Sequence, residues 1–290
     1  MKKFLYAFVA AAFPVFVVAQ KVTGKLVFQQ GQVLAVTMEV KNKVGQEAMG
    51  NNIDFNVDGV ATHTFRVTNT TEDNHTLHHD VKKITFKFDG MGQKRSFDSD
   101  NAKDMEGFFG APVKDILGKS YDMIIDPSGK ALIIKPEKIE LAKYDDRLAI
   151  VFNMLKDVTN VVYPPKKNEA SFFKVLPDTA VGINDTWSEI SDTEGGKMTT
   201  VYKLSAITDS TIIVDLAGKS SSVTKTEMMG TSMVTTTSSN YTGKIIADKA
   251  TGIIREKTIT TESTGSTEAM GGNMPVTAKT TITIVVKPTE

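Results

Sequence analysis

Residues 34–40, LAVTMEV, place Leu34, Val36, Met38 and Val40 at every second position of the chain. Alternate side chains of a β-strand point to opposite faces, so a period of two residues indicates a strand with one buried face. We therefore expect this segment to be a half-buried strand, and the rest of the sequence can be compared with it.

The same alternation recurs at residues 53–57, 84–88 and 282–286. Thr and Val are frequent around these runs, as is typical of pleated, half-buried strands. Turn-forming residues separate the runs, at Asp58-Gly59, Asp89-Gly90, Pro127-Ser128-Gly129, Gly195-Gly196 and Gly271-Gly272. The chain is therefore predicted to be mainly β, with a curved antiparallel sheet, because sheets of this size twist and curl.

One segment has a different period. Between residues 137 and 160 the apolar positions are three or four apart, which indicates one face of a helix; they are Leu141, Tyr144, Leu148, Val151, Phe152, Leu155 and Val158. Pro136 stands where a helix can begin, and Pro164 prevents its continuation. A second, short helix is expected at residues 112–117. The long helix should pack its apolar face on the sheet.

This pattern divides the chain into a β half at residues 20–136, a linking helix at 137–163 and a second β half at 164–290, which we expect to form one continuous β unit. The halves resemble each other, since residues 124–129 and 245–252 both run from a strand through an Asp-to-Gly turn. Two interpretations of this likeness stay open: an internal duplication, or the strand-turn-strand repetition that any antiparallel meander shows.

The N-terminus has the features of a cleavable signal peptide. Lys2 and Lys3 precede an apolar run that ends at small residues, with cleavage expected between Ala19 and Gln20. The run is shorter than the roughly 20 residues of a membrane-spanning helix. Residues 1–19 are thus predicted to be removed, which gives a periplasmic or secreted protein without a transmembrane span.

Composition narrows the function further. The 34 basic and 34 acidic residues give no net charge, so nothing favours binding to nucleic acid. Cysteine is absent, which excludes disulfides, thiolate metal sites and a cysteine nucleophile. No nucleophile elbow, zinc-protease motif, phosphate loop or dinucleotide fingerprint is present. We therefore expect a protein that is not an enzyme and has no cofactor.

A Met-Gly element repeats at predicted hairpin tips. Turn tips normally carry Asn, Asp or Ser, so methionine there is unusual. The methionines concerned are Met49, Met91, Met228, Met229, Met233, Met270 and Met274. They could form an apolar rim that touches a ligand, lipid or partner, bind Cu(I) through their thioethers, or fold back onto the sheet.

Two polar clusters are weaker candidates. His75, His78 and His79 could bind zinc or copper, but in a strand His75 and His79 face one way and His78 the other, which favours a role without metal. The acidic residues between 98 and 106 could bind calcium. They lack the calcium-loop pattern, and capping of a helix by Asp98, Ser99 or Asp100 is the simpler role.

Several short motifs resemble a family of secreted Bacteroidota proteins of unknown function. They are Leu176-Pro177, Val181-Gly182, Asp185-Thr186-Trp187, Phe97-Asp98-Ser99 and Gly118-Lys119-Ser120-Tyr121. The family is similar in architecture to the lipoprotein-carrier superfamily, which implies a half-barrel with helix on its concave side. The resemblance supplies no catalytic residues, and this chain lacks the cysteine on which lipoproteins are anchored.

Two functions follow as expectations. The chain is an exported carrier of an apolar ligand such as a lipid, or it is a structural module that docks another envelope protein through its sheet edges or Met-Gly tips.

Overall fold

The computed structural model describes residues 20–48, 51–90, 92–142, 148–193, 195–228, 231–269 and 272–289. The strands are β1 Lys21–Val22, β2 Val33–Ala48, β3 Asn51–Thr70, β4 His75–Gly90, β5 Gln93–Asp98, β6 Ser120–Ile125, β7 Ala131–Lys135, β8 Val181–Gly182, β9 Thr186–Thr193, β10 Gly196–Ile207, β11 Thr211–Met228, β12 Thr231–Asp248, β13 Ile254–Ala269 and β14 Gly272–Thr289. The helices are α1 Ala102–Glu106, α2 Gly110–Leu117 and α3 Ala149–Thr159, followed by the 3-10 turn η2 Asn160–Val162. The protein is mainly β, as the alternation predicts.

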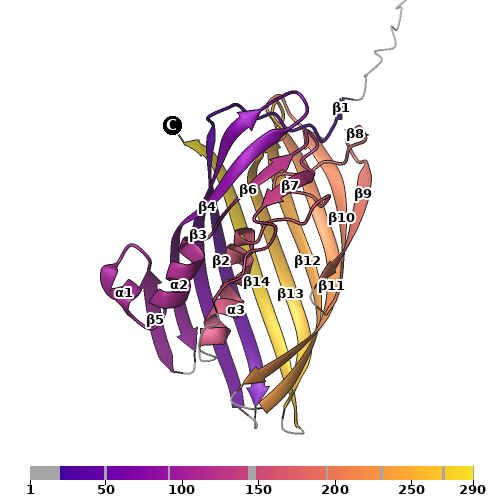
Figure 1. Cartoon of the computed structure of the whole chain (residues 1–290). Helices are drawn as coiled ribbons and strands as arrows, with labels where there is room; N and C mark the ends of the chain where they lie inside the picture. The colour runs from indigo at the N-terminus through magenta and orange to yellow at the C-terminus, as the bar shows by residue number, and fades with distance from the viewer. Residues whose placement is uncertain are drawn as a thin grey trace, which may run out of the picture.

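Twelve strands form one large antiparallel sheet (Figure 1). Its order is β7-β6-β4-β3-β2-β14-β13-β12-β11-β10-β9, with β5 paired to β4. The last strand, β14, pairs with β2, so the first and the last strands of the large sheet's long meander are neighbours in the middle of that sheet. Within the described residues the sheet is not closed, because β7 and β9 end the order without pairing to each other.

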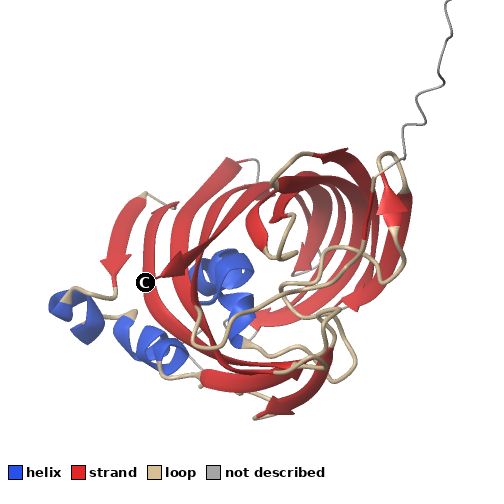
Figure 2. Ribbon diagram, turned by 90° about the horizontal axis from the view of Figure 1, so that it is seen from above, coloured by secondary structure: helices blue, strands red, loops and turns tan. Residues whose placement is uncertain are grey.

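The sheet bends around α3, which lies inside the curve (Figure 2). Helix α3 packs on β2 and β3. The buried face predicted from residues 34–40 is confirmed, since Val36 and Val40 are fully buried there. Leu155 and Val158 of α3 are fully buried against the same face. Removing one such side chain from water stabilises the fold by about 1.5–3 kcal/mol.

Helix α3 is shorter than the apolar pattern predicts. Residues 137–142 are not helical, and α3 begins only at Ala149. The Ala142 backbone N–H donates to an Asp115 carboxylate oxygen at 2.7 Å, while Ile139 is buried in the core. This segment is therefore committed to contacts with α2 and the core, which a helix at the same residues would break.

The turn predicted at Asp58-Gly59 is also wrong, because both residues lie within the long strand β3. A side chain at Gly59 would place its Cβ 2.2 Å from Leu155 Cδ2. Leu155 of α3 thus occupies the space that a side chain at position 59 would need, and a glycine that reads as a turn signal serves helix packing.

The short helix predicted at 112–117 is confirmed within α2, which ends at Gly118. The expected caps before α1 are wrong. The side chain of Asn101 caps α1, accepting the Lys103 backbone N–H at 3.0 Å. Asp98 instead accepts the Asp100 N–H, and the Ser99 hydroxyl accepts the Ile84 N–H and not an N–H of α1.

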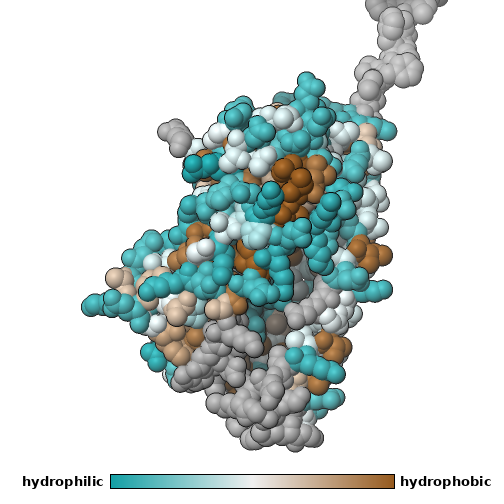
Figure 3. All heavy atoms as spheres, viewed as in Figure 1, coloured by the Kyte–Doolittle hydropathy of each residue, from teal (hydrophilic) through white to brown (hydrophobic). Residues whose placement is uncertain are grey.

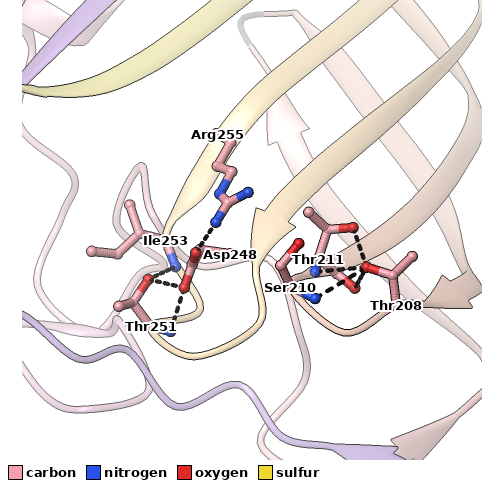
Figure 4. A network of polar contacts seen from close by, with 7 residues as sticks. All are labelled: Thr208, Ser210, Thr211, Asp248, Thr251, Ile253 and Arg255. Carbon is pink, nitrogen blue, oxygen red and sulfur yellow. Dashed lines mark hydrogen bonds and ion pairs between the residues drawn. The ribbon is translucent and has the colours of Figure 1, made fainter.

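The upper end of the sheet in Figure 1 is tied together by the N-terminal segment. Leu26 N–H donates to the Pro127 carbonyl at 2.6 Å, and Val27 N–H donates to the Thr251 carbonyl at 2.8 Å. These bonds join the β6–β7 turn to the β12–β13 turn. In the second turn Asp248 accepts both the N–H and the hydroxyl of Thr251 and pairs with Arg255 (Figure 4).

Candidate functional site

The candidate site is a cavity of about 710 Å³ on the inner face of the sheet, beside α3. It lies between β4 and β5 on one side and α1, the α1–α2 junction and α3 on the other. Its lining includes Phe88, Phe97, Phe108 and Phe109, and we call it the phenylalanine pocket. Val151 of α3 also lines it. Pockets for small ligands usually measure about 300–1,000 Å³ and are lined mainly by apolar groups.

Strand register places the aromatic wall. Phe86 and Phe88 alternate on the inner face of β4, where Phe86 pairs directly with Phe97 of β5. The Phe86 and Phe97 rings stack with centroids 5.2 Å apart, and Phe109 meets the Phe86 ring edge-on at 5.0 Å. Such aromatic pairs add about 0.5–1.5 kcal/mol each beyond the burial of their area. Phe86 thus supports Phe97 and Phe109, which both line the pocket.

The α1–α2 junction supplies the outer wall. Gly110 lies against α1, and a Cβ at this position would come within 1.9 Å of the Met105 carbonyl oxygen. The tight junction turns Phe109 inward, where it is half-buried, and leaves Phe108 51% exposed at the mouth. In Figure 3 moderately apolar residues, coloured pale brown, lie over α1 and β5 among hydrophilic ones, and a more strongly apolar patch lies over β7.

The mouth of the phenylalanine pocket carries more positive than negative charge. Arg95 and Lys103 line it, and Arg95 makes one long hydrogen bond, at 3.4 Å, to Gln93. Asp104 also lines it, but its carboxylate accepts the Asp98 backbone N–H at 2.9 Å. An apolar wall below two cations suits a ligand that has an apolar body and an acidic end.

Two buried histidines, His63 and His79, lie on the inner face of the sheet next to the C-terminal end of α3. His63 Nε2 lies 2.9 Å from the Val158 carbonyl oxygen and must donate to it, so His63 Nδ1 accepts from His79 Nε2 at 3.1 Å. His79 Nδ1 is then a buried acceptor without a partner among the described residues. Burial lowers the pKa of His63 to about 4 and that of His79 to about 3. Both rings are therefore neutral near pH 7.

The three histidines considered as metal ligands do not converge. His75 and His79 are buried on the inner face and His78 points outward, where it meets Asp122 at 2.7 Å. The alternation predicted for them is confirmed. No cluster of three metal-binding side chains occurs among the described residues.

The described residues that flank three of the Met-Gly elements pair at the lower end of the sheet in Figure 1: Ala48 with Asn51, Met228 with Thr231 and Ala269 with Gly272. Met49, Met91, Met229 and Met270 lie outside the described residues, as do residues 1–19 with the predicted cleavage site at Ala19. Met228 ends β11. Met233 and Met274 are half-buried, and Met274 Sδ accepts from Gln46 Nε2 at 3.8 Å.

Sequence reasoning missed both the phenylalanine pocket and the His63–His79 pair. The alternation of Phe86 and Phe88 signalled one side of the pocket, but nothing local placed Phe109 opposite it. No helix in the described part of the chain is long and apolar enough to span a bilayer.

Comparison with known proteins gives a partial match. Residues 166–254 match the model of a family of unknown function, DUF6263. No curated protein matches the chain. Among solved structures, lipovitellin, from a study of its lipid–protein interactions, has a TM-score of 0.47 and 11% identity. The likeness covers 90% of this chain, which spans 25% of that one. An outer membrane channel from Pseudomonas putida F1 has a TM-score of 0.23 and 6% identity over 91% of this chain and 98% of its own. The segment from 166 to 254, most of the second β half, is thus similar to a family whose function is unknown.

Proposed function

We propose that this chain is an exported, non-enzymatic carrier that binds an apolar ligand with an acidic end, such as a fatty acid or lipid, in the phenylalanine pocket. The observation that supports it most is a cavity of about 710 Å³ whose wall combines phenylalanine rings with a helix that does not fill it. In this proposal the curved, open sheet acts as a half-barrel, and α3 occupies only the part over β2 and β3.

The charges at the mouth set the orientation of the ligand. The acidic end would lie at Arg95 and Lys103, and the apolar body would pack on Phe88, Phe97 and Phe109. Arginine is well suited to this role because its planar guanidinium donates two parallel hydrogen bonds to a carboxylate. The signal-like residues 1–19 support a periplasmic or secreted location.

Displacement of a dansyl-labelled fatty acid by oleate, measured by fluorescence, tests the proposal. Val151→Phe, which fills the cavity, should weaken binding at least tenfold. Arg95→Gln should weaken oleate binding about tenfold and leave oleyl alcohol unaffected. Lys94→Gln is the matched control, because Lys94 faces outward and pairs with Asp89 at 3.1 Å. Equal binding by the wild type and Val151→Phe would refute the proposal.

A docking module is the second candidate, and the edge strand β9 favours it. Ile190 on β9 is 72% exposed, and Val201, its diagonal neighbour on β10, is 46% exposed. Unpaired strand edges with apolar side chains accept strands from other chains. A photocrosslinker at position 190 should capture a protein in the native host, whereas one at the outward-facing control position 219 should not. Identical results at the two positions, with no protein captured, would count against this role.

A further inference from the structure

The inner face has a second region of interest, which α3 leaves uncovered. Helix α3 packs on β2 and β3, whereas the inner positions of β9 to β13 belong to the far arm of the curve (Figure 2). Inner positions are identified by register: Lys257 of β13 pairs with Ile245 and Ile284, which are both buried in the core. Lys257 therefore points to the same side as the core.

Lys257 is unusual because it lies among apolar side chains without an ion pair. It is half-buried, its direct neighbours on the inner face are isoleucines, and none of the described residues forms an ion pair with it. Burying a charge is costly unless a partner compensates it. Burial lowers the pKa of Lys257, and the negative charge of Glu189 opposes that shift.

Glu189 also points to the inner face, because it pairs with the buried Thr200. It lies on β9, four strands from β13 in the sheet order, yet it is near enough to act on Lys257. The two do not form a contact ion pair, and the Glu189 carboxylate accepts the Tyr202 hydroxyl at 3.1 Å instead. Glu189 of β9 and Lys257 of β13 therefore both point to the inside of the curve, since their cross-strand partners Thr200 and Ile245 are buried.

Trp187 adds a second donor without an acceptor. It shares the inner face with Glu189, two residues away, and its ring stacks on Tyr202 at 5.4 Å. Its indole Nε1 is buried and has no hydrogen-bond partner among the described residues. Buried polar groups in native proteins are nearly always paired, so an unpaired donor here requires an explanation.

Partly exposed apolar side chains lie next to Lys257. Ile259 and Ile282 form a direct cross-strand pair on the inner face, one position below Lys257, and both are half-buried. Tyr241 follows on β12, with its hydroxyl 2.6 Å from Thr200 Oγ1. The Lys257 ammonium group and the Trp187 indole N–H can bind the charged head of an amphipathic anion, and the isoleucines can contact its apolar chain.

We propose that the inner face between β9 and β13 is a second binding site, which holds the oxyanion head of an amphipathic ligand at Lys257 and its chain against Ile259 and Ile282. The head is a carboxylate or a phosphate monoester, because both offer the negative oxygens that an ammonium group and an indole N–H require. This site lies on the opposite side of α3 from the phenylalanine pocket and does not depend on it.

Trp187 is the only tryptophan in the chain, so its fluorescence and its indole N–H signal in a nitrogen-15 NMR spectrum report on this site alone. Octanoate, octyl phosphate and octanol are titrated into the full chain. We expect saturable shifts of the indole signal with octanoate or octyl phosphate, and binding at least tenfold weaker with octanol.

Lys257→Met keeps the length of the side chain and removes the charge. It should weaken binding of the two anions tenfold or more without changing octanol binding. Lys279→Met is the matched control, because Lys279 faces outward and pairs with Glu262 at 2.9 Å. Val151→Phe should leave the Trp187 response intact, which separates this site from the phenylalanine pocket.

Octanol that binds as tightly as octanoate would overturn the proposal, and so would anion binding that is unchanged in Lys257→Met. If Lys257→Met does not fold, Lys257→Arg replaces it: this variant keeps the charge and should keep anion binding within a few-fold of wild type, and its complete loss would also overturn the proposal.

Discussion

Replacing the two buried histidines should remove much of the acid sensitivity of this fold. His63 and His79 are fully buried, and their pKa values of about 4 and about 3 lie well below the ordinary histidine value of about 6.5. The unfolded chain therefore binds protons as the pH falls below about 6.5, while the folded chain does not until about pH 4. Folding stability from both rings is complete at high pH and declines as the pH falls through this window.

The size of the effect follows from these values. Between pH 8 and pH 5 each histidine lowers the free energy of unfolding by about 2 kcal/mol. The reason is that pH 5 lies about 1.5 units below the pKa of about 6.5 in the unfolded chain, and each unit is worth about 1.36 kcal/mol. The pair therefore lowers the free energy of unfolding by about 4 kcal/mol. Since domains are typically stable by only about 5–15 kcal/mol, a loss of this size is easy to measure.

Other groups do not obscure the comparison between wild type and variants. Burial also lowers the pKa of His75, so this ring costs stability as the pH falls below about 6.5, but it is present in the wild type and in the variants. Asp80, Asp126 and Asp248 have lowered pKa values, so their contributions are lost only below about pH 4. Burial raises the pKa of Asp157, which acts in the opposite direction, but this carboxyl is present in the wild type and in the variants. Its effect therefore cancels in the comparison.

The assay is urea unfolding at pH 8 and pH 5, followed by the fluorescence of Trp187. We expect the wild type to lose about 4 kcal/mol more than the double variant His63→Leu/His79→Phe over this range. His79→Phe alone should remove about half of this extra loss, because one of the two buried histidines remains. A phenylalanine ring should fit there, since the rings of Phe65 and Tyr121 lie 4.9 and 4.6 Å from the His79 ring. His78→Gln, at the surface, is the control. A double variant that loses as much stability as the wild type would refute the reasoning.

Three further changes test other parts of the structure. Leu155→Ala, at a fully buried position of α3, should lower the free energy of unfolding by about 2–5 kcal/mol in a urea titration, and a loss below about 1 kcal/mol would mean that α3 is not packed as described. Asp248→Ala should cost about 1–3 kcal/mol, because it removes the acceptor of the Thr251 N–H and hydroxyl and the partner of Arg255, and amide exchange at Thr251 should speed up selectively. Gly110→Ala should cost about 1–3 kcal/mol and weaken ligand binding in the phenylalanine pocket, since its Cβ would meet the Met105 carbonyl at 1.9 Å; an unchanged melting temperature would contradict this.

The strands were predictable because their signal is local. Leu34, Val36, Met38 and Val40 identify the buried face of β2 by their spacing alone, without reference to any other strand. The pattern at 137–160 correctly placed Leu155 and Val158 on a buried helical face. It could not reveal that Asp115, on another element, would hold the backbone at Ala142 out of the helix.

The parts that were missed depend on contacts between distant strands. His63 shares the inner face with Ala61 and Phe65, but bulges between Thr62 and His63 and beyond Val67 shift the pairing with β4. Without that register no sequence argument brings His63 to His79. Lys257 is a similar case, because a lysine in a Thr-rich strand reads as a solvent-facing residue until its pairing with the buried Ile245 and Ile284 is known.

The inner face itself changes character along the strands, and this change limits where an apolar ligand can lie. On β12 the inner residues pass from Ile245 and Tyr241 near the core to Ser239, Thr237 and Thr235 toward the Met-Gly tips.

The hydroxyls in this lower part satisfy one another across strands, as in Ser239–Ser263 at 2.7 Å and Thr235–Thr267 at 2.9 Å. Threonine keeps a high preference for strands, and hydroxyls avoid the large exposed apolar surface that the same positions would form with Ile or Val. An uncovered inner face is tolerated there because it is polar. A lipid chain would gain little by lying on it, so the proposed apolar ligands would lie in the phenylalanine pocket on one side of α3 and on the isoleucines next to Lys257 on the other.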